Sequence, residues 1–213
     1  SQLAISNVHS SYPEFAVAGG RLIIAAASLT NFRDGVWAVS ADGAAELLRI
    51  APETVDIYWQ NRFVSFAPVG ERVFFQDVNF FDEGRVCVTD GTIAGTSCLG
   101  NEIRGDGGYS GSTNEKYFFF GLASEEYGLF ASDGSTGGTT LLRTWPDSPF
   151  QAAQEIYSGP SRVYFVEPQS DGLARLSVSD GTAAGTAQLS RPEHPSLDAA
   201  SDLAWLGETF FVW

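Results

Sequence analysis

Short hydrophobic runs separated by polar turns recur along the whole chain. The runs are rich in Val, Ile, Phe, Tyr and Thr, and clusters of Gly, Asp, Asn and Ser separate them. Runs of this composition predict β-strands, and the clusters predict the turns between the strands. No 3.6-residue pattern of useful length is present, so the sequence predicts an all-β fold.

Four Asp-Gly dipeptides, at Asp42, Asp90, Asp133 and Asp180, recur at spacings of 43–48 residues, which is the strongest signal in the sequence. Three copies extend to the turn motif Asp-Gly-Thr/Ser-x-x-Gly-Thr, whereas the first copy keeps only Asp-Gly. The turn-motif residues are Asp42, Gly43, Asp90, Gly91, Thr92, Gly95, Thr96, Asp133, Gly134, Gly138, Thr139, Asp180, Gly181, Thr182, Gly185 and Thr186. Such periodic repetition is typical of propellers and solenoids.

A basic residue opens an aromatic or β-branched run upstream of each turn motif. The four copies are Arg21, Arg72, Lys116 and Arg162, and a fifth run begins at Thr209 without a basic residue. One short run precedes each basic residue, and an alternating run leads into each turn motif. Each repeat therefore holds about four strands in about 45 residues, the size of a β-propeller blade.

The sequence thus predicts a single β-propeller domain. It would have four complete blades, at approximately residues 13–50, 61–100, 107–144 and 154–190, and part of a fifth at 201–213. The N-terminal run that begins at Leu3 would add an outer strand to the partial blade, as a closing clasp. A β-sandwich also has regular short strands, but it has no reason to repeat one turn sequence.

The repeats resemble the ELW-x-x-DGT-x-x-GT family of large bacterial secreted and surface proteins. Segments 86–96 (VCVTDGTIAGT), 129–139 (LFASDGSTGGT) and 175–186 (RLSVSDGTAAGT) carry the resemblance, and 36–43 (VWAVSADG) is a shorter copy. The Glu-Leu-Trp start of the family motif is matched only in part, at Val36-Trp37. The resemblance implies a repeat scaffold in a secreted or surface protein and no particular activity.

Two interpretations of the turn motif remain open. Asp, Gly and Thr lock hairpin turns through bonds between side chains and the backbone. Alternatively, the repeated oxygens form a ring of calcium or sugar sites, one in each blade. A calcium site needs several converging oxygen ligands, and each motif holds one carboxylate. We therefore expect no cofactor, with calcium as the alternative.

The two cysteines flank the second turn motif, at Cys87 and Cys98. In an antiparallel hairpin they would face each other, within the Cα separation of about 4.4–6.8 Å that a disulfide requires. We expect a disulfide, with two free thiols as the alternative. A disulfide favours an oxidising compartment, so we expect a secreted, cell-surface or periplasmic protein. His9 and His194 do not form a zinc pattern with them.

Two groups of residues are candidates for ligand binding. A ring of cations formed by the four basic residues named above would suit an anionic ligand, although cations at strand entrances also keep turns solvated. Trp59 and Trp145 lie in links between blades, where aromatic rings stack on sugars or fill the wedge between blades.

The chain is acidic, with 26 Asp and Glu against 12 Lys and Arg among its 213 residues and a net charge of −14. This charge argues against nucleic acid and anionic membranes as partners. No apolar run approaches the roughly 18 residues of a membrane span. Several turns between strands also carry acidic residues. These residues are either simply solvated, or they together give one rim of the propeller a negative electrostatic field. They are Asp34, Asp77, Asp82, Glu83, Glu125, Glu126 and Asp171.

The sequence contains none of the common hydrolase, metalloprotease or nucleotide-binding motifs. We therefore predict a non-catalytic extracellular binding or scaffold module, with a protein or a glycan as its partner. A lectin-like propeller and part of a secreted hydrolase are the alternatives. Because the chain lacks Met and starts at Ser1, we expect a piece of a longer chain. The alternative is a partner that covers the apolar edge at Trp213.

Overall fold

The computed structural model describes residues 3–4, 15–28, 34–50, 62–78, 84–100, 102–124, 126–145, 156–168, 174–189, 203–206 and 209–212. These residues form strands and turns, and every strand pair is antiparallel. The prediction of an all-β fold is confirmed. The same ranges contain no helix that could span a membrane.

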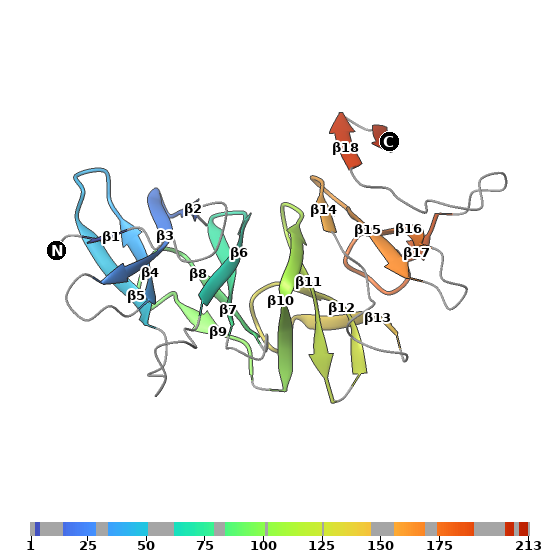
Figure 1. Cartoon of the computed structure of the whole chain (residues 1–213), viewed down its shortest axis with the longest axis horizontal. Helices are drawn as coiled ribbons and strands as arrows, with labels where there is room; N and C mark the ends of the chain where they lie inside the picture. Colours follow the sequence, from blue (N-terminus) through green and yellow to red (C-terminus); the bar gives the residue numbers. More distant parts are fainter. Residues whose placement is uncertain are drawn as a thin grey trace.

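Most of the strands belong to four antiparallel units, which follow one another in chain order (Figure 1). Unit 1 consists of β2 (Phe15–Ala18), β3 (Arg21–Ser28), β4 (Asp34–Val39) and β5 (Ala45–Ile50). Unit 2 consists of β6 (Arg62–Val69), β7 (Arg72–Val78), β8 (Gly84–Thr89) and β9 (Ser97–Cys98). Unit 3 consists of β10 (Ile103–Ser112), β11 (Tyr117–Ala123), β12 (Glu126–Ser132) and β13 (Thr139–Thr144). Unit 4 consists of β14 (Ile156–Ser158), β15 (Val163–Pro168), β16 (Ala174–Ser179) and β17 (Ala187–Gln188).

Two further strands, β18 (Leu203–Leu206) and β19 (Thr209–Val212), follow unit 4 and pair with each other. In Figure 1 β18 lies above β14 of unit 4, and units 1 and 4 stand at opposite ends of the row. Units 2 and 3 are joined into one sheet through a single residue pair, Gly105 of β10 and Gly84 of β8.

Strand β1 (Leu3–Ala4) does not join the last strands as a clasp, contrary to the prediction. It pairs with β3, through Leu3 opposite Ser28 and Ala4 opposite Ala27. The reason lies in strand length, because the four residues of β2 cover only the first half of β3. The far end of β3 therefore keeps unpaired backbone groups, and β1 satisfies them.

Strand β10 begins at Ile103, before the expected blade boundary at residue 107. Residues 103–105 pair with the far end of β11, and the register shifts between Gly105 and Ser110 before pairing resumes. The glycine-rich segment within this shift has the composition of a turn, but it forms a bulge inside one long strand.

The core lies between the units, because alternate residues of the second strand point to opposite neighbours. In unit 3, Phe118 and Phe120 of β11 pack onto Val163 and Phe165 of unit 4. We call the face of a unit that packs onto the following unit its trailing face, and the opposite face its leading face. The same alternation joins units 1 and 2, where Ile23 packs with Val73 and Phe75, and units 2 and 3, where Phe74 packs with Tyr117 and Phe119.

Candidate functional site

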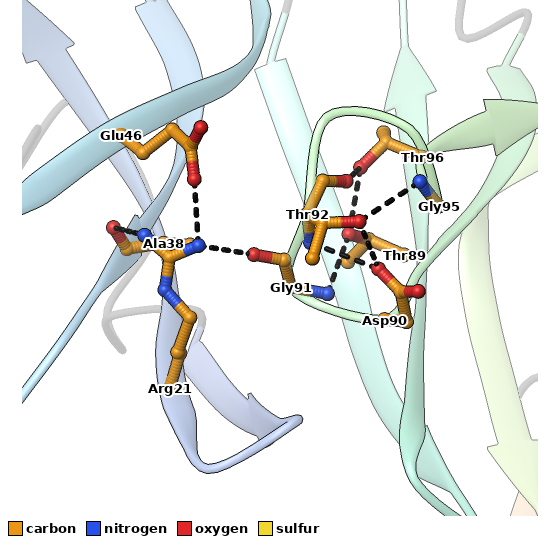
Figure 2. A network of polar contacts seen from close by, with 9 residues as sticks. All are labelled: Arg21, Ala38, Glu46, Thr89, Asp90, Gly91, Thr92, Gly95 and Thr96. Atoms are coloured by element: carbon orange, nitrogen blue, oxygen red, sulfur yellow. Dashed lines mark hydrogen bonds and ion pairs between the residues drawn. The ribbon is translucent and has the colours of Figure 1, made fainter.

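The turn motif of unit 2 is a hairpin loop closed by its own side chains (Figure 2). The Asp90 carboxylate accepts hydrogen bonds from the Thr92 amide, at 2.9 Å, and from the Thr92 hydroxyl, at 2.7 Å. The Thr92 hydroxyl in turn accepts from the Gly95 amide at 3.0 Å. The Thr96 hydroxyl donates to the Thr92 carbonyl at 2.6 Å and so joins the two ends of the loop.

A residue that the sequence motif did not include anchors this loop to the sheet. Thr89, directly before Asp90, is buried and lies 2.7 Å from the Thr96 hydroxyl. Its hydroxyl also accepts a hydrogen bond from the Gly91 amide at 3.0 Å. The signal that could have revealed it is a hydroxyl residue before Asp in all three complete motifs, at Thr89, Ser132 and Ser179.

The loops of units 3 and 4 repeat this network bond for bond. Corresponding distances differ by at most 0.1 Å among the three loops. The bonded side chains are Ser132, Asp133, Ser135 and Thr139 in unit 3, and Ser179, Asp180, Thr182 and Thr186 in unit 4. The repeated residues are therefore partners of one another.

Steric constraints explain why glycine occupies both positions of the motif. Gly91 has φ of +91°, a conformation that residues with a Cβ rarely adopt, and a Cβ there would lie 2.9 Å from the Ala18 carbonyl oxygen of unit 1. A Cβ at Gly95 would overlap the Asp90 carboxylate. The first glycine therefore serves the turn and the contact between units, and the second makes room for the carboxylate.

The hydrogen bonds lower the pKa of each motif carboxyl group. For Asp90 and Asp180 the largest cause is the following Thr hydroxyl, and the backbone amide adds to it. For Asp133 the Ser135 amide contributes most, and the Arg72 cation of unit 2 lowers the pKa further. All three carboxylates are exposed, and each stays ionised because its charge accepts two hydrogen bonds.

The first Asp-Gly turn is simpler. The Ala44 amide donates to the Asp42 carboxylate at 3.0 Å, and the Gly43 amide donates to the Ser40 carbonyl at 2.9 Å. Ala41 stands where the other loops have a buried hydroxyl. This loop keeps the turn and lacks the hydroxyl network.

Cys87 and Cys98 form a disulfide, as the hairpin position predicted. They face each other directly across β8 and β9. The Leu99 amide donates to the Val86 carbonyl beside them, which makes the cysteines a non-hydrogen-bonded pair. Such pairs have the closest Cα atoms in antiparallel sheets, and here the Cα separation is 3.9 Å, below the range expected above. The equivalent pairs are Phe130–Leu141 and Ser177–Gln188.

The recurrent basic residue links a unit to the loop of the next unit. Arg21 of unit 1 donates to the Gly91 carbonyl of unit 2 at 2.6 Å, and also to the Glu46 carboxylate and the Ala38 carbonyl of its own unit (Figure 2). Lys116 of unit 3 donates to the Gly181 carbonyl of unit 4 at 2.6 Å. These two cations hold neighbouring units together, a role that sequence reasoning missed.

The other two basic residues occupy the equivalent places. The Arg72 guanidinium lies 5.9 Å from the Phe74 ring centroid, and its Nη1 would be 3.2 Å from a Cβ at Gly134 of unit 3. Arg162 belongs to unit 4, and its charge contributes to the lowered pKa of Asp180 in the same unit. The four residues therefore share a position in the repeat, and each of the first three lies beside the loop of the following unit.

Two ion pairs join the fourth strand of one unit to the second strand of the next. Arg49 of β5 donates to the buried carboxylate of Asp77 in β7, with Nε at 2.8 Å. Arg143 of β13 lies 3.1 Å from the carboxylate of Glu167 in β15, which is fully buried. Asp77 therefore does not contribute to an acidic rim, because β7 places its side chain inside the interface.

Of the two candidate tryptophans, Trp145 is described. Its ring packs edge-on against Phe120 and Phe165, with centroids 5.7 and 6.4 Å away, and so fills the space between units 3 and 4. Trp59, Trp213, His9 and His194 lie outside the described residues. So do the acidic turn residues Asp82, Glu83, Glu125 and Asp171.

Within the described part of the chain, no three His, Cys, Asp or Glu side chains are grouped as metal ligands would be. The carboxylate of each complete turn motif is instead bonded to the amide and hydroxyl two residues later. The geometry of the loops thus fits the hairpin interpretation, since their oxygens converge on donors of the loop itself.

No protein-family model matches the chain, and no curated protein matches its sequence. Among solved structures, the chain is similar to an acylaminoacyl peptidase of Pyrococcus horikoshii, with a TM-score of 0.50 and 13% identity over 84% of this chain and 27% of that one. A prolyl endopeptidase structure gives a TM-score of 0.50 and 15% identity over 84% and 26%. The β-propeller domain of the trilobed protease from Pyrococcus furiosus gives a TM-score of 0.43 and 13% identity, over 87% of this chain and 71% of that one.

This chain spans about a quarter of the length of the two peptidases. At such low identity the likeness concerns the fold alone. The structural neighbours are β-propeller proteins, and the all-β antiparallel architecture of this chain agrees with theirs.

Proposed function

We propose that this chain is a β-propeller with units 1 to 4 as complete blades and β18 and β19 as part of a fifth. We further propose that it is a non-catalytic extracellular scaffold or binding module built from divergent repeats of the ELW-x-x-DGT-x-x-GT type. The observation that carries this proposal is that the repeated polar residues form hydrogen bonds within the protein itself. Their side chains bond within the loops, and Arg21 and Lys116 bond to the loop of the next unit.

A protein is the partner that this arrangement suits. Blades joined by such bonds hold their exposed loops in fixed positions, while the loop sequences vary at little cost to the core. A net charge of −14 attracts a partner with a basic surface. Trp145, one of the two aromatic candidates for stacking on sugar, is used in packing between units.

The partner's charge can be tested with the immobilised chain and two peptides of equal length, one rich in lysine and one rich in glutamate. We expect binding of the lysine-rich peptide alone, with an affinity that falls as salt is added. Binding of neither peptide, or of both equally, would contradict a basic partner.

The non-catalytic role can be tested with a panel of peptide and glycoside substrates, together with tryptophan fluorescence during titration with oligosaccharides. We expect no turnover and no fluorescence change. Turnover that disappears in a folded point variant would establish an enzyme, and saturable quenching by a sugar would establish a lectin.

The extracellular location rests on the disulfide, since such bonds persist in oxidising compartments. The native protein should therefore gain about 2 Da in intact mass on reduction, as the two thiols of a former disulfide take up hydrogen. An unchanged mass would remove this support.

A further inference from the structure

The first Asp-Gly turn has the backbone of the other three turns but not their surroundings. Gly43 has φ of +82°, and the corresponding glycines of the complete motifs have φ of +91°, +94° and +84°. Each of these glycine amides also donates a hydrogen bond, to a buried hydroxyl in the complete motifs and to the Ser40 carbonyl in unit 1. A chemical difference between the turns therefore comes from what surrounds the Asp-Gly pair.

The aspartate side chain is held less firmly in the first turn. Among the described residues, the Asp42 carboxylate accepts a hydrogen bond from the Ala44 amide alone, at 3.0 Å. In unit 2 the Asp90 carboxylate accepts from both the amide and the hydroxyl of Thr92, and a Cβ at Gly95 would lie 2.1 Å from it (Figure 2). Units 3 and 4 repeat both features. A complete motif therefore restrains its carboxylate by a second hydrogen bond and by close packing.

The glycine is also more open in the first turn. Gly43 is exposed, and within the described part of the chain no atom lies within 4 Å of the place of a Cβ at this residue. Gly91 and Gly181 are buried, and their carbonyls accept hydrogen bonds at 2.6 Å from Arg21 and Lys116 of the preceding units. In unit 3 the corresponding glycine is half-buried beside the cation of unit 2. The first turn is thus freer to change its backbone and side-chain angles.

An Asp-Gly pair with this freedom rearranges without an enzyme. The amide nitrogen of the glycine attacks the side-chain carboxyl carbon, so that an N–Cγ bond forms, a C–O bond breaks and water leaves. Glycine favours the attack because it has no Cβ to hinder it. Water then adds to the main-chain carbonyl of the cyclic imide and breaks its bond to the nitrogen, which leaves the chain running through the side chain as isoaspartate. Because the water released in the first step is taken up in the second, the product is an isomer of the starting chain.

We propose that Asp42 is a modification site, at which the folded protein converts Asp42-Gly43 to isoaspartate, whereas the hydroxyl networks protect the Asp-Gly pairs of the three complete motifs. Solvent water is the only co-reactant. This modification is independent of what the scaffold binds.

The protection follows from the hydrogen bonds on the carboxylate. A complete motif must give up two of these bonds before it reacts, whereas the first turn gives up one, and the additional bond slows the reaction about fivefold. The reacting form of the carboxyl group is the neutral acid, and the lowered pKa of the motif carboxyl groups keeps that form scarce. We therefore expect at least about fivefold more isoaspartate at Asp42 than at Asp90, Asp133 or Asp180.

Three further Asp-Gly pairs, at Asp34, Asp106 and Asp171, do not belong to these turns. Gly35 lies within β4 and is paired with both β3 and β5. Asp106 accepts a hydrogen bond from the Tyr127 hydroxyl at 2.6 Å, and Asp171 lies outside the described residues. The experiment below therefore compares the four turns that share one backbone.

Isomerisation at Asp42 would act on the hairpin that links unit 1 to unit 2. β5 follows this turn, and its Glu46 and Arg49 bond to Arg21 and to Asp77 of unit 2. Isoaspartate adds a carbon atom to the main chain between β4 and β5 and so disturbs the positions of these side chains. The aged wild-type chain should unfold at a lower guanidinium concentration than an Asp42→Glu chain aged in parallel, and equal midpoints would contradict this effect.

The test ages the full chain in two forms, folded in neutral buffer, and denatured and reduced in guanidinium chloride. A protein-isoaspartate methyltransferase labels isoaspartate in both samples, and peptide mass spectrometry locates the label. The folded chain should carry the label at Asp42 well above the other three turns, whereas the denatured chain should carry it at all four, because glycine follows each aspartate. Equal labelling of the four folded turns, or no label at Asp42, would overturn the proposal. A preference for Asp42 that persists in the denatured chain would also overturn it, since the folded loops would not be its cause.

Two variants complete the test, and circular dichroism should show both folded. Asp42→Glu is the control for the site, because its longer side chain does not form the five-membered imide, and it should lose only the label at residue 42. Thr92→Ala tests the protection, since it removes the hydroxyl donor of Asp90 and keeps the amide donor. It should raise the label at Asp90 about fivefold and leave that at Asp133 unchanged. An unchanged label at Asp90 would overturn the protective role of the network.

Discussion

At the scale of single residues, one carboxylate oxygen organises each complete turn motif. In unit 4, Asp180 Oδ1 accepts from the amide and the hydroxyl of Thr182, at 2.8 and 2.7 Å. The same hydroxyl accepts from the Gly185 amide, so the side chains of Asp180 and Thr182 together bind two backbone amides of the loop. Because charge strengthens a hydrogen bond, the ionised form of Asp180 holds the loop better than the neutral form.

Replacing Asp180 tests this role. Asp180→Ala should lower the free energy of unfolding by about 1 kcal/mol, since it removes two hydrogen bonds at an exposed site. Asp180→Asn is the control, because its amide oxygen still accepts both bonds. Urea denaturation at neutral pH measures both variants, and equal stability of the alanine variant and the wild type would contradict the role.

The lowered pKa of the three motif carboxyl groups also predicts a pH dependence. A group with a lower pKa in the folded state stabilises the fold above its unfolded pKa of about 3.9. That stability is lost as the pH falls through the folded value. Thermal unfolding should show a smaller loss of Tm between neutral pH and about pH 3 when Asp90, Asp133 and Asp180 are all replaced by Asn. A loss as large as in the wild type would assign the acid sensitivity to other carboxyl groups.

At the scale of strands and units, each interface combines aromatic packing with polar links at its margin. Between units 2 and 3, Phe74 stacks on Tyr117 with ring centroids 4.9 Å apart, and Tyr117 stacks on Phe119 at 5.7 Å. Between units 3 and 4, the cation of Lys116 and the ion pair of Arg143 with Glu167 flank the aromatic cluster. The polar links fix how the apolar faces meet, because they have directional partners.

The ion pair between β13 and β15 should be costly to break from one side. Arg143→Met removes the Arg143 cation from beside the fully buried Glu167 carboxylate and should destabilise the chain by about 3 kcal/mol. The double variant Arg143→Met, Glu167→Leu should recover most of that loss, since it buries no charge. Chemical denaturation of the four members of this double-mutant cycle measures the coupling, and additive effects would contradict it.

The cation that reaches the next loop should contribute less. Lys116→Met removes the bond to the Gly181 carbonyl and should cost about 1 kcal/mol of unfolding free energy. Arg162→Met, at the same place in unit 4, should change stability by less than about 0.5 kcal/mol in dilute solution. Equal losses in the two variants would show that the bond between units is not the cause.

At the scale of the whole molecule, the four units form a row in which each contacts its neighbours (Figure 1). In the second strands of units 2 and 3, residues 73–78 and 117–120 are buried, whereas Phe15, Val17 and Leu22 on the leading face of unit 1 are exposed. In arrays of this kind, stability depends on the interfaces between neighbours. The central units should therefore be the most stable part of the chain.

Hydrogen exchange measured by mass spectrometry tests this gradient. Amides of β7 and β11 should exchange most slowly, and those of β2 and β3 several-fold faster, because Phe15, Val17 and Leu22 of unit 1 are exposed. Uniform protection across the units would mean that the chain unfolds as one cooperative body and would contradict the gradient.

The sequence by itself determined the elements of this fold. Val, Ile, Phe and Tyr in short runs, punctuated by Asp-Gly turns, are local properties, so they predicted the strands of the four units and the hairpin that pairs Cys87 with Cys98. Local chemistry also favoured the hairpin interpretation of the turn motif, although Thr89, Ser132 and Ser179 went unnoticed as its anchors.

Only the tertiary structure decided what the recurrent cations and the acidic residues of the strands do. Arg21 meets Gly91 across 70 positions of sequence, and Arg49 meets Asp77 across 28. These partners belong to different units, so no local pattern specifies them. They depend on which face of one sheet packs onto the next. The pairing of β1 with β3 is likewise between segments that are distant in the sequence, and it depends on how much of β3 the strand β2 leaves unpaired.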